Sequence, residues 1–251
     1  KMAKKKKSAL SRWVAGALMA AGALGITWFL ISFDNKKTDS RGCLANGPDG
    51  QTSLSILIDA TEPLTSSQLE NVAVIVQQKV SSLQPYDRIR FYAIKETNGQ
   101  PLPPLFDLCK PDPDSMESSI TKRFERLRFQ SEIENELRNN SGVQPLSPII
   151  FSLGSVASQF ESKERNREIV LVSDLIQNSE MLSMYRSDWE RQAESQAVNK
   201  SRPMLQGIGL QLLWLMRPEE DRQTKLLREW WIEYIRKSGG YVSTVQPITG
   251  N

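Results

Sequence analysis

Hydrophobic residues recur along this chain with two different periods, which distinguish predicted strands from predicted helices. Six short stretches are rich in β-branched or aromatic residues, or alternate apolar and polar positions, as strands do. In chain order, these predicted strands are residues 54–58, 88–94, 105–109, 169–173, 208–216 and 241–245. An Asn98-Gly99 turn and the proline-rich residues 101–104 separate the second stretch from the third, so we expect these two strands to form a hairpin.

Between the predicted strands, apolar residues recur at the spacing of a helix. The first helix is expected to open on a capping box at Ser67–Glu70 and to end before Pro85. Ser147 is expected to cap another helix, with Pro148 at its first position. The remaining predicted helices are a charged segment at 114–139, a polar segment at 186–198, and an apolar stripe from 226 that ends at the glycines 239–240.

The order of these elements predicts the fold class. It is β-α-β-β-α-α-β-α-β-α-β, and strands that alternate with helices require a mainly parallel sheet covered on both faces. The hairpin makes one edge strand antiparallel. We therefore expect a doubly covered, Rossmann-like α/β domain at residues 52–248.

A different pattern precedes this domain. Residues 13–33 contain no charged residue and carry tryptophan or phenylalanine at both ends, which favours a transmembrane helix across a hydrocarbon core of roughly 30 Å. A cleaved signal peptide is the alternative, but the apolar run is long for one. Residues 1–12 then form a basic cytoplasmic tail, and residues 34–51 a tether.

The charges beside the span predict its direction. Six basic residues precede it and three follow it, so the domain is expected on the exported side, periplasmic if the membrane is a bacterial inner membrane. Cys43 and Cys109 are the only cysteines, and an even pair in an exported domain favours a disulfide. Within the span, Gly16 and Ala20 begin small-xxx-small pairs that permit self-association.

Composition excludes several chemistries. The 251 residues include no histidine, which excludes Ser-His-Asp and Cys-His catalysis and histidine-ligated zinc. No glycine-rich phosphate loop follows a predicted strand. The formal charge is only +3, and much of the basic excess lies in the tail. We therefore expect a membrane contact and no nucleic-acid partner.

Two acidic residues stand where α/β proteins bind ligands. Asp59 and Asp174 each follow an apolar predicted strand, at the carboxyl edge of the expected sheet. With the hydroxyl of Thr61, the two carboxylates could hold Mg²⁺. The alternative is that each aspartate caps the turn or helix that follows it.

The element order and the runs Ser55-Ile-Leu-Ile-Asp-Ala-Thr61 and Ile169-Val-Leu-Val-Ser-Asp174 resemble those of a von Willebrand factor type A domain. The resemblance covers about residues 52–248. It implies a metal held by a D-x-S-x-S loop after the first strand, a threonine before a later helix and an aspartate after the fourth strand. An acidic residue of the partner would complete the shell of the metal.

This sequence keeps only part of that implied site. Asp59 matches the first aspartate, and Thr61 stands for the first serine, whereas Pro63 occupies the place of the second. Gln144 takes the position of the threonine, and Asp174 matches the last aspartate. The resemblance therefore implies a degenerate site with no cofactor, or with Mg²⁺ at most.

The leading hypothesis is a non-catalytic, membrane-anchored module that binds another protein, as one subunit of a membrane complex. Its contacts would come from the loops that carry Glu62, Gln144 and Gln177. An adhesion domain with a working Mg²⁺ site is one alternative. A second is a haloacid-dehalogenase-like phosphatase with Asp59 as nucleophile, although Thr61 takes the place of the second aspartate of that motif.

Overall fold

The structure is a computed structural model. The residues that it describes are 38–46, 50–59, 61, 63–95, 99–112, 118–126, 130–139, 145–217 and 220–250. The predicted tail, the predicted span with Gly16 and Ala20, and the start of the tether lie outside this set. The chain from Thr38 onward folds as one unit.

A six-stranded sheet forms the centre of this unit, in the order β3-β2-β1-β4-β5-β6. Every neighbouring pair is parallel except β2 with β3, which is antiparallel. The expected fold class and the antiparallel edge strand are therefore confirmed. The strands are β1 (Thr52–Ile58), β2 (Arg88–Ala93), β3 (Phe106–Cys109), β4 (Asn166–Ser173), β5 (Ile208–Leu215) and β6 (Tyr241–Ile248).

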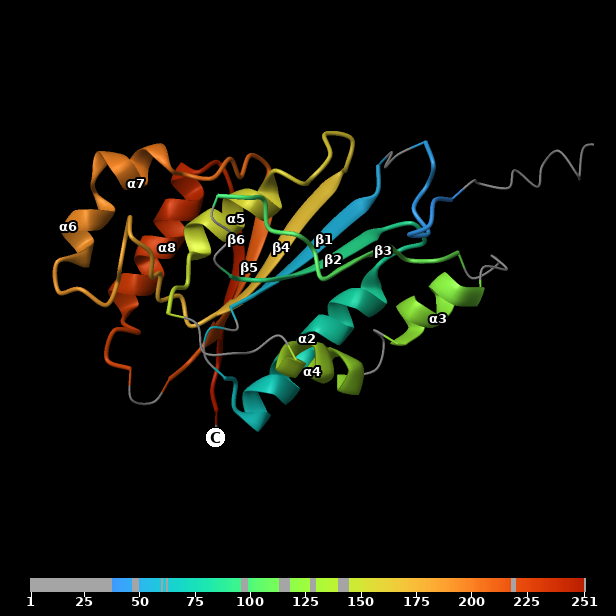
Figure 1. The fold of residues 1–251 in the computed structure, drawn as a ribbon, viewed down its shortest axis with the longest axis horizontal. Helices are drawn as coiled ribbons and strands as arrows, with labels where there is room; N and C mark the ends of the chain where they lie inside the picture. Colours follow the sequence, from blue (N-terminus) through green and yellow to red (C-terminus); the bar gives the residue numbers. More distant parts are fainter. Residues whose placement is uncertain are drawn as a thin grey trace, which may run out of the picture. The chain divides into compact units, whose positions relative to one another are not determined.

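Helices cover both faces of the sheet (Figure 1). On one face lie α2 (Ser66–Ser82), α3 (Ser118–Arg126) and α4 (Gln130–Asn139). The other face carries α5 (Ile149–Ala157), α6 (Trp189–Ala193), α7 (Gln196–Lys200) and α8 (Lys225–Lys237). The chain crosses from strand to strand through these helices, as parallel pairing requires.

The sheet divides the core into two layers. Along β1, Leu54, Ile56 and Ile58 belong to the layer that contains α2, whereas Leu57 belongs to the opposite layer, which contains α5. Successive side chains of a strand point to opposite faces, so a strand buried on both faces must be apolar at nearly every position. This explains why the central predicted strands appear in the sequence as continuous apolar runs.

Several helical predictions change in detail. The charged segment at 114–139, predicted as one helix, contains two helices, α3 and α4. The polar segment at 186–198 contains two short helices, because Ser195 ends one and caps the next by accepting a hydrogen bond from the N–H of Val198. The capping box of α2 is not at Ser67. Thr65 accepts from the N–H of Gln68, whose side chain accepts from the N–H of Thr65, so the helix starts earlier than predicted.

Candidate functional site

The strand order makes the carboxyl edge between β1 and β4 the topological switch point of the sheet. From β1 the chain runs outward to β2 and β3 on one side, and β4 leads to β5 and β6 on the other. Ligands of open α/β sheets bind at such a switch point. Asp59 lies there, directly after β1, and its N–H donates to the carbonyl of Val172 at 2.7 Å.

The carboxylate of Asp59 accepts four hydrogen bonds. Oδ1 accepts from the N–H of Thr61 at 3.3 Å and from its hydroxyl at 2.8 Å. Oδ2 accepts from the hydroxyls of Ser147 and Ser173, both at 2.8 Å. Asp59 is only 4% exposed, so these bonds replace its lost hydration. We call Asp59, Thr61, Ser147 and Ser173 the Asp59 hub.

Two members of the hub were not predicted. Ser147 was expected to cap a helix, but α5 starts at Ile149 without a side-chain cap, and the Ser147 hydroxyl donates to Asp59 instead. Ser173 comes into reach through strand register, since Ile58 pairs with Val172 and the next residues therefore lie side by side. The only sequence signal for Ser173 was its place at the end of an apolar strand.

Asp174 lies at the same edge, and one of its carboxylate oxygens has a local partner. Its Oδ1 accepts from the N–H of Ile176 at 2.9 Å, which makes an Asx turn. Its carbonyl accepts from the indole N–H of Trp214 at 3.0 Å and from the amide of Gln223 at 3.1 Å. One carboxylate oxygen of Asp174 therefore shapes the loop after β4, as the turn-capping alternative expected.

Leu175 has a backbone conformation that favours glycine. Its φ is 65°, a left-handed value that residues with a Cβ rarely adopt. Its side chain is fully buried, its N–H donates to the hydroxyl of Ser173, and its carbonyl accepts from the indole of Trp231 at 2.7 Å. Packing and hydrogen bonds therefore hold a strained turn beside the hub.

The hub offers only oxygen donors, the kind that Mg²⁺ prefers. The carboxylate of Asp59 is nevertheless satisfied by protein hydrogen bonds alone. Among the residues that the structure describes, no three histidine, cysteine or acidic side chains gather as a metal cluster. The oxygen ligands of the hub therefore suit a hard cation. The Asp59 carboxylate does not need a cation to be satisfied, because protein hydrogen bonds already satisfy it.

Of the predicted partner-binding residues, Glu62 and Gln144 lie outside the described residues. Gln177 is 1% exposed and connects two segments. Its Oε1 accepts from the N–H of Ile150 at 2.9 Å, and its Nε2 donates to the hydroxyl of Ser179 at 2.9 Å. Its side chain positions the start of α5 against the loop after β4.

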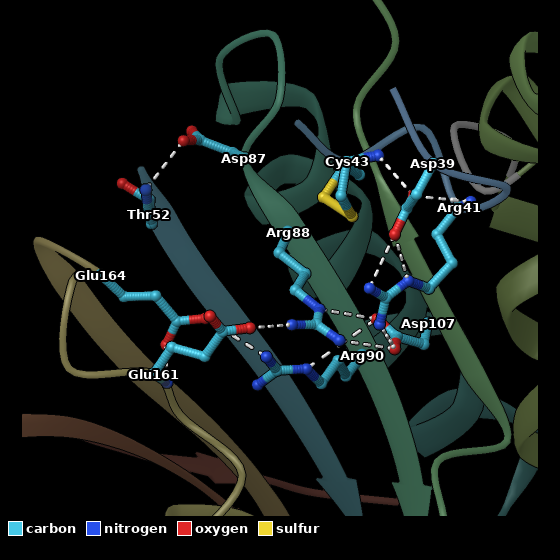
Figure 2. Close-up of a disulfide and its surroundings, with 11 residues drawn as sticks. Asp39, Arg41, Cys43, Thr52, Asp87, Arg88, Arg90, Asp107, Glu161 and Glu164 are labelled. Carbon is cyan, nitrogen blue, oxygen red and sulfur yellow. Dashed lines mark hydrogen bonds and ion pairs between the residues drawn. A yellow bond between two sulfur atoms is a disulfide. The ribbon is translucent and has the colours of Figure 1, made fainter. Parts of the chain in front are cut away.

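The predicted disulfide is present at the opposite end of the sheet. Cys43 is bonded to Cys109, which ends β3 and pairs with Arg88 at the start of β2. The N–H of Cys109 donates to the carbonyl of Arg41 at 2.9 Å. The bond therefore fastens part of the tether to the amino edge of the sheet (Figure 2).

A network of charged residues lies beside this disulfide (Figure 2). Asp107 accepts from Arg88 at 2.8 and 2.7 Å and from Arg41 at 3.2 Å. Arg90, which is 1% exposed, pairs with Glu164 at 3.2 Å. Burial by itself would raise the pKa of Asp107, but hydrogen bonds from Arg88 and the nearby guanidinium charges outweigh it and lower that pKa. The network therefore needs Asp107 ionised.

Among the described residues, no helix is both long enough and apolar enough to cross a membrane. The predicted span at 13–33 lies outside them and stays a prediction.

No protein-family model matches the chain, and no curated protein matches it significantly. Several solved structures are similar to it, and they include the following three. The conserved hypothetical protein BatB from Bacteroides thetaiotaomicron is 16% identical with a TM-score of 0.45, over 79% of this chain and 91% of that one. An aerotolerance-related membrane protein from Bacteroides fragilis is 14% identical with a TM-score of 0.40, over 78% and 90%. Proximal thread matrix protein 1 from the mussel byssus is 13% identical with a TM-score of 0.39, over 80% and 42%.

Proposed function

We propose that this chain is a membrane-anchored protein-interaction module whose α/β domain binds another protein through the carboxyl edge of its sheet. The observation that carries the proposal is the Asp59 hub. It joins the loop after β1, the segment before α5 and the end of β4 through one buried carboxylate. Loops held in this way form a surface before any partner arrives, and preformed surfaces lose less entropy on binding.

A second set of bonds supports the same surface. Ser147 and Asn178 exchange two backbone hydrogen bonds of 2.9 Å. Asn178 also donates from its side chain to the carbonyl of Pro145 and accepts from the hydroxyl of Ser183. The loop after β4 is therefore tied both to itself and to the segment before α5.

The proposed location is the exported side of a membrane, with residues 13–33 as the anchor and residues 1–12 in the cytoplasm. The Cys43–Cys109 disulfide supports this side, because disulfides persist in oxidising compartments and are rare in the cytosol. The module would then be a non-catalytic subunit of a membrane complex.

Comparative purification from native membranes tests the binding edge. The tagged full-length chain carries Asp221→Arg, an exposed position between β5 and α8. Two further variants, Glu62→Arg and Gln144→Arg, change residues that the sequence predicts to bind a partner. The matched controls are Lys163→Glu and Arg165→Glu, exposed charge reversals at the amino edge. Partner recovery, measured by quantitative mass spectrometry, should fall several-fold in the first set only. Equal partner recovery with the variants and with the controls, at unchanged melting temperatures, would contradict the proposal.

A second candidate function is Mg²⁺-dependent ligand binding, favoured by the three hydroxyls that meet at Asp59. Asp59, Thr61 and Ser147 would hold the ion with Asp174, and the ion would present an open coordination position to an acidic group of a partner. Calorimetry with Mg²⁺ or Mn²⁺ tests it. Binding heat that disappears in Asp174→Asn, which keeps an acceptor for the N–H of Ile176, would support this function.

The phosphatase alternative stays a prediction of the sequence. Mg²⁺-dependent hydrolysis of p-nitrophenyl phosphate that Asp59→Asn abolishes would favour it over both binding functions.

A further inference from the structure

A pocket with a volume of about 370 Å³ opens beside the hub. Its apolar wall consists of Leu146, Pro148, Ile150, Phe151 and Met181, from the start of α5 and the loop after β4. Phe151 is 39% exposed, so this wall reaches the surface. The volume is within the range of about 300–1,000 Å³ that is usual for ligand sites.

The wall is fixed before anything binds. Gln177 connects the N–H of Ile150 to the hydroxyl of Ser179 across the pocket lining. The backbone hydrogen bonds between Ser147 and Asn178 also join the segment before α5 to the loop after β4. A pocket with such walls does not need to be ordered by its occupant.

The polar groups of the lining distinguish between kinds of occupant. Small-molecule sites fix their ligand with a few polar groups directed into the cavity. Here the amide of Gln177 already donates to Ser179 and accepts from Ile150. The pocket therefore offers mainly shape and apolar contact. That suits a side chain whose main chain is held elsewhere, the usual form of an anchor residue in a protein interface.

Charge indicates what should flank this anchor. Glu180 is exposed, and of the described residues that line the pocket it is the only charged one. A carboxylate at an apolar opening favours a cation on the partner and disfavours an anion.

We propose that this pocket receives one apolar side chain, aromatic or the size of leucine, which a partner protein presents next to a lysine or arginine that meets Glu180. The inference rests on the proposed function and deepens it, since it names the chemistry of the bound segment. The Mg²⁺ candidate has a different requirement, because a metal site would need an acidic group on the partner.

The test uses the full chain in phosphatidylcholine nanodiscs, with ¹³C-labelled methionine methyl groups. The probe is the peptide acetyl-Ala-Lys-Phe-Lys-Ala-amide. One control peptide has serine in place of phenylalanine, and another has glutamate in place of both lysines. Met181 reports on the pocket, with its signal assigned by its loss in Met181→Leu. Met204, which is 86% exposed and not part of the lining, is the internal control.

The probe should shift the Met181 signal saturably and leave the Met204 signal unchanged. Binding should weaken more than about ten-fold for the serine peptide, because the apolar anchor is lost. Glu180→Gln should weaken binding of the basic probe by about two- to five-fold, the range of an exposed ion pair. Ser201→Trp, which fills the pocket, should abolish binding, whereas Ser162→Trp at the amino edge should not.

No Met181 shift at the solubility limit of the probe, equal shifts of both methionines, or binding that survives Ser201→Trp would each overturn the pocket. Glutamate and lysine peptides that bind equally would overturn the flanking cation. The purification of partners from native membranes shows whether only the pocket proposal fails or the proposed function fails as well. If Ser201→Trp leaves recovery intact while the Glu62, Gln144 and Asp221 variants lose it, the binding edge stands without the pocket.

Discussion

At the scale of single residues, Asp59 has a structural role that does not depend on any ligand. Its buried carboxylate is the shared acceptor for the hydroxyls of Thr61, Ser147 and Ser173. Hydrogen bonds to a charged acceptor contribute about 1.5–3 kcal/mol each, and orphaned buried groups are costly. The side chains that would serve binding therefore also stabilise the fold.

Replacing Asp59 with alanine should lower the free energy of unfolding by about 3 kcal/mol, since three buried hydroxyls lose their acceptor. Asp59→Asn should cost less, because one carbonyl oxygen remains. Urea denaturation of the two variants and the wild type measures this order. A stability loss in Asp59→Ala below that of Asp59→Asn would contradict the shared-acceptor role.

Leu175 allows a prediction of which of two substitutions, to glycine or to alanine, leaves the domain more stable. Alanine is normally more favourable than glycine in a folded backbone. At a φ of 65° the order should reverse, because a Cβ is penalised there. We expect both substitutions to destabilise by opening a cavity, with Leu175→Gly more stable than Leu175→Ala by about 1 kcal/mol. Thermal unfolding of the pair decides the matter, and equal stability would mean that the turn relaxes.

At the scale of elements, local capping and long-range fastening act at opposite ends of the sheet. The capping box of α2 lies just after the hub loop, and the disulfide lies at the amino edge. The box fixes where a helix begins, whereas the disulfide restricts how far a segment before the sheet can move. Each contribution can be removed separately.

Thr65→Ala should destabilise the domain by about 1 kcal/mol, because the N–H of Gln68 loses its acceptor at the start of α2. Ser66→Ala is the matched control, one position inside the helix and exposed, and should be neutral within a few tenths of a kcal/mol. Chemical denaturation compares them. A larger loss of stability in Ser66→Ala than in Thr65→Ala would show that Thr65 is not the capping residue.

Replacing Cys43 and Cys109 together with serine should cost roughly 4 kcal/mol, since the bond closes a loop with a sequence separation of 66. The reason is the greater conformational entropy of the unfolded chain. Denaturation of the double variant, compared with the oxidised wild type, measures the loss. A change below about 1 kcal/mol would contradict this entropic account of the disulfide.

At the scale of the whole molecule, the charged network at the amino edge makes stability depend on pH. The pKa values of Asp107 and Asp39 are lowered in the folded state, although burial would raise both, because arginine hydrogen bonds and charges outweigh it. For a carboxyl with a depressed folded pKa, the unfolded state binds protons first as pH falls. The contribution is then complete above the unfolded pKa and is lost progressively as pH falls from that value through the lower folded pKa.

Stability should therefore be level above about pH 5 and fall as pH drops through the ordinary aspartate value of 3.8 toward the lower folded values. Asp107→Asn should lower stability at neutral pH and flatten this acid dependence. Urea midpoints between pH 2 and pH 7 measure both effects, with the wild type as reference. An unchanged pH slope in Asp107→Asn would contradict the assignment, whatever the loss at neutral pH.

The sequence by itself determined what depends on neighbours along the chain. Period and composition located the strands, the hairpin and the main helices, and their order implied a mainly parallel sheet, because a parallel connection needs a crossover. The Cys43–Cys109 disulfide was predicted from the even number of cysteines and the expected export of the domain to an oxidising compartment.

Tertiary structure decided what depends on residues distant in sequence. Ser147 is 88 positions from Asp59, and Ser173 is 114 positions away. Ser173 reaches it because β1 lies beside β4 in one register, and Ser147 reaches it from the segment before α5, which pairs with Asn178 in the loop after β4. Periodicity specifies which face a side chain takes but not which strand lies next to it. The hub, the pocket beside it and the charged network at the other edge were therefore set by strand neighbours and register, which no local pattern encodes.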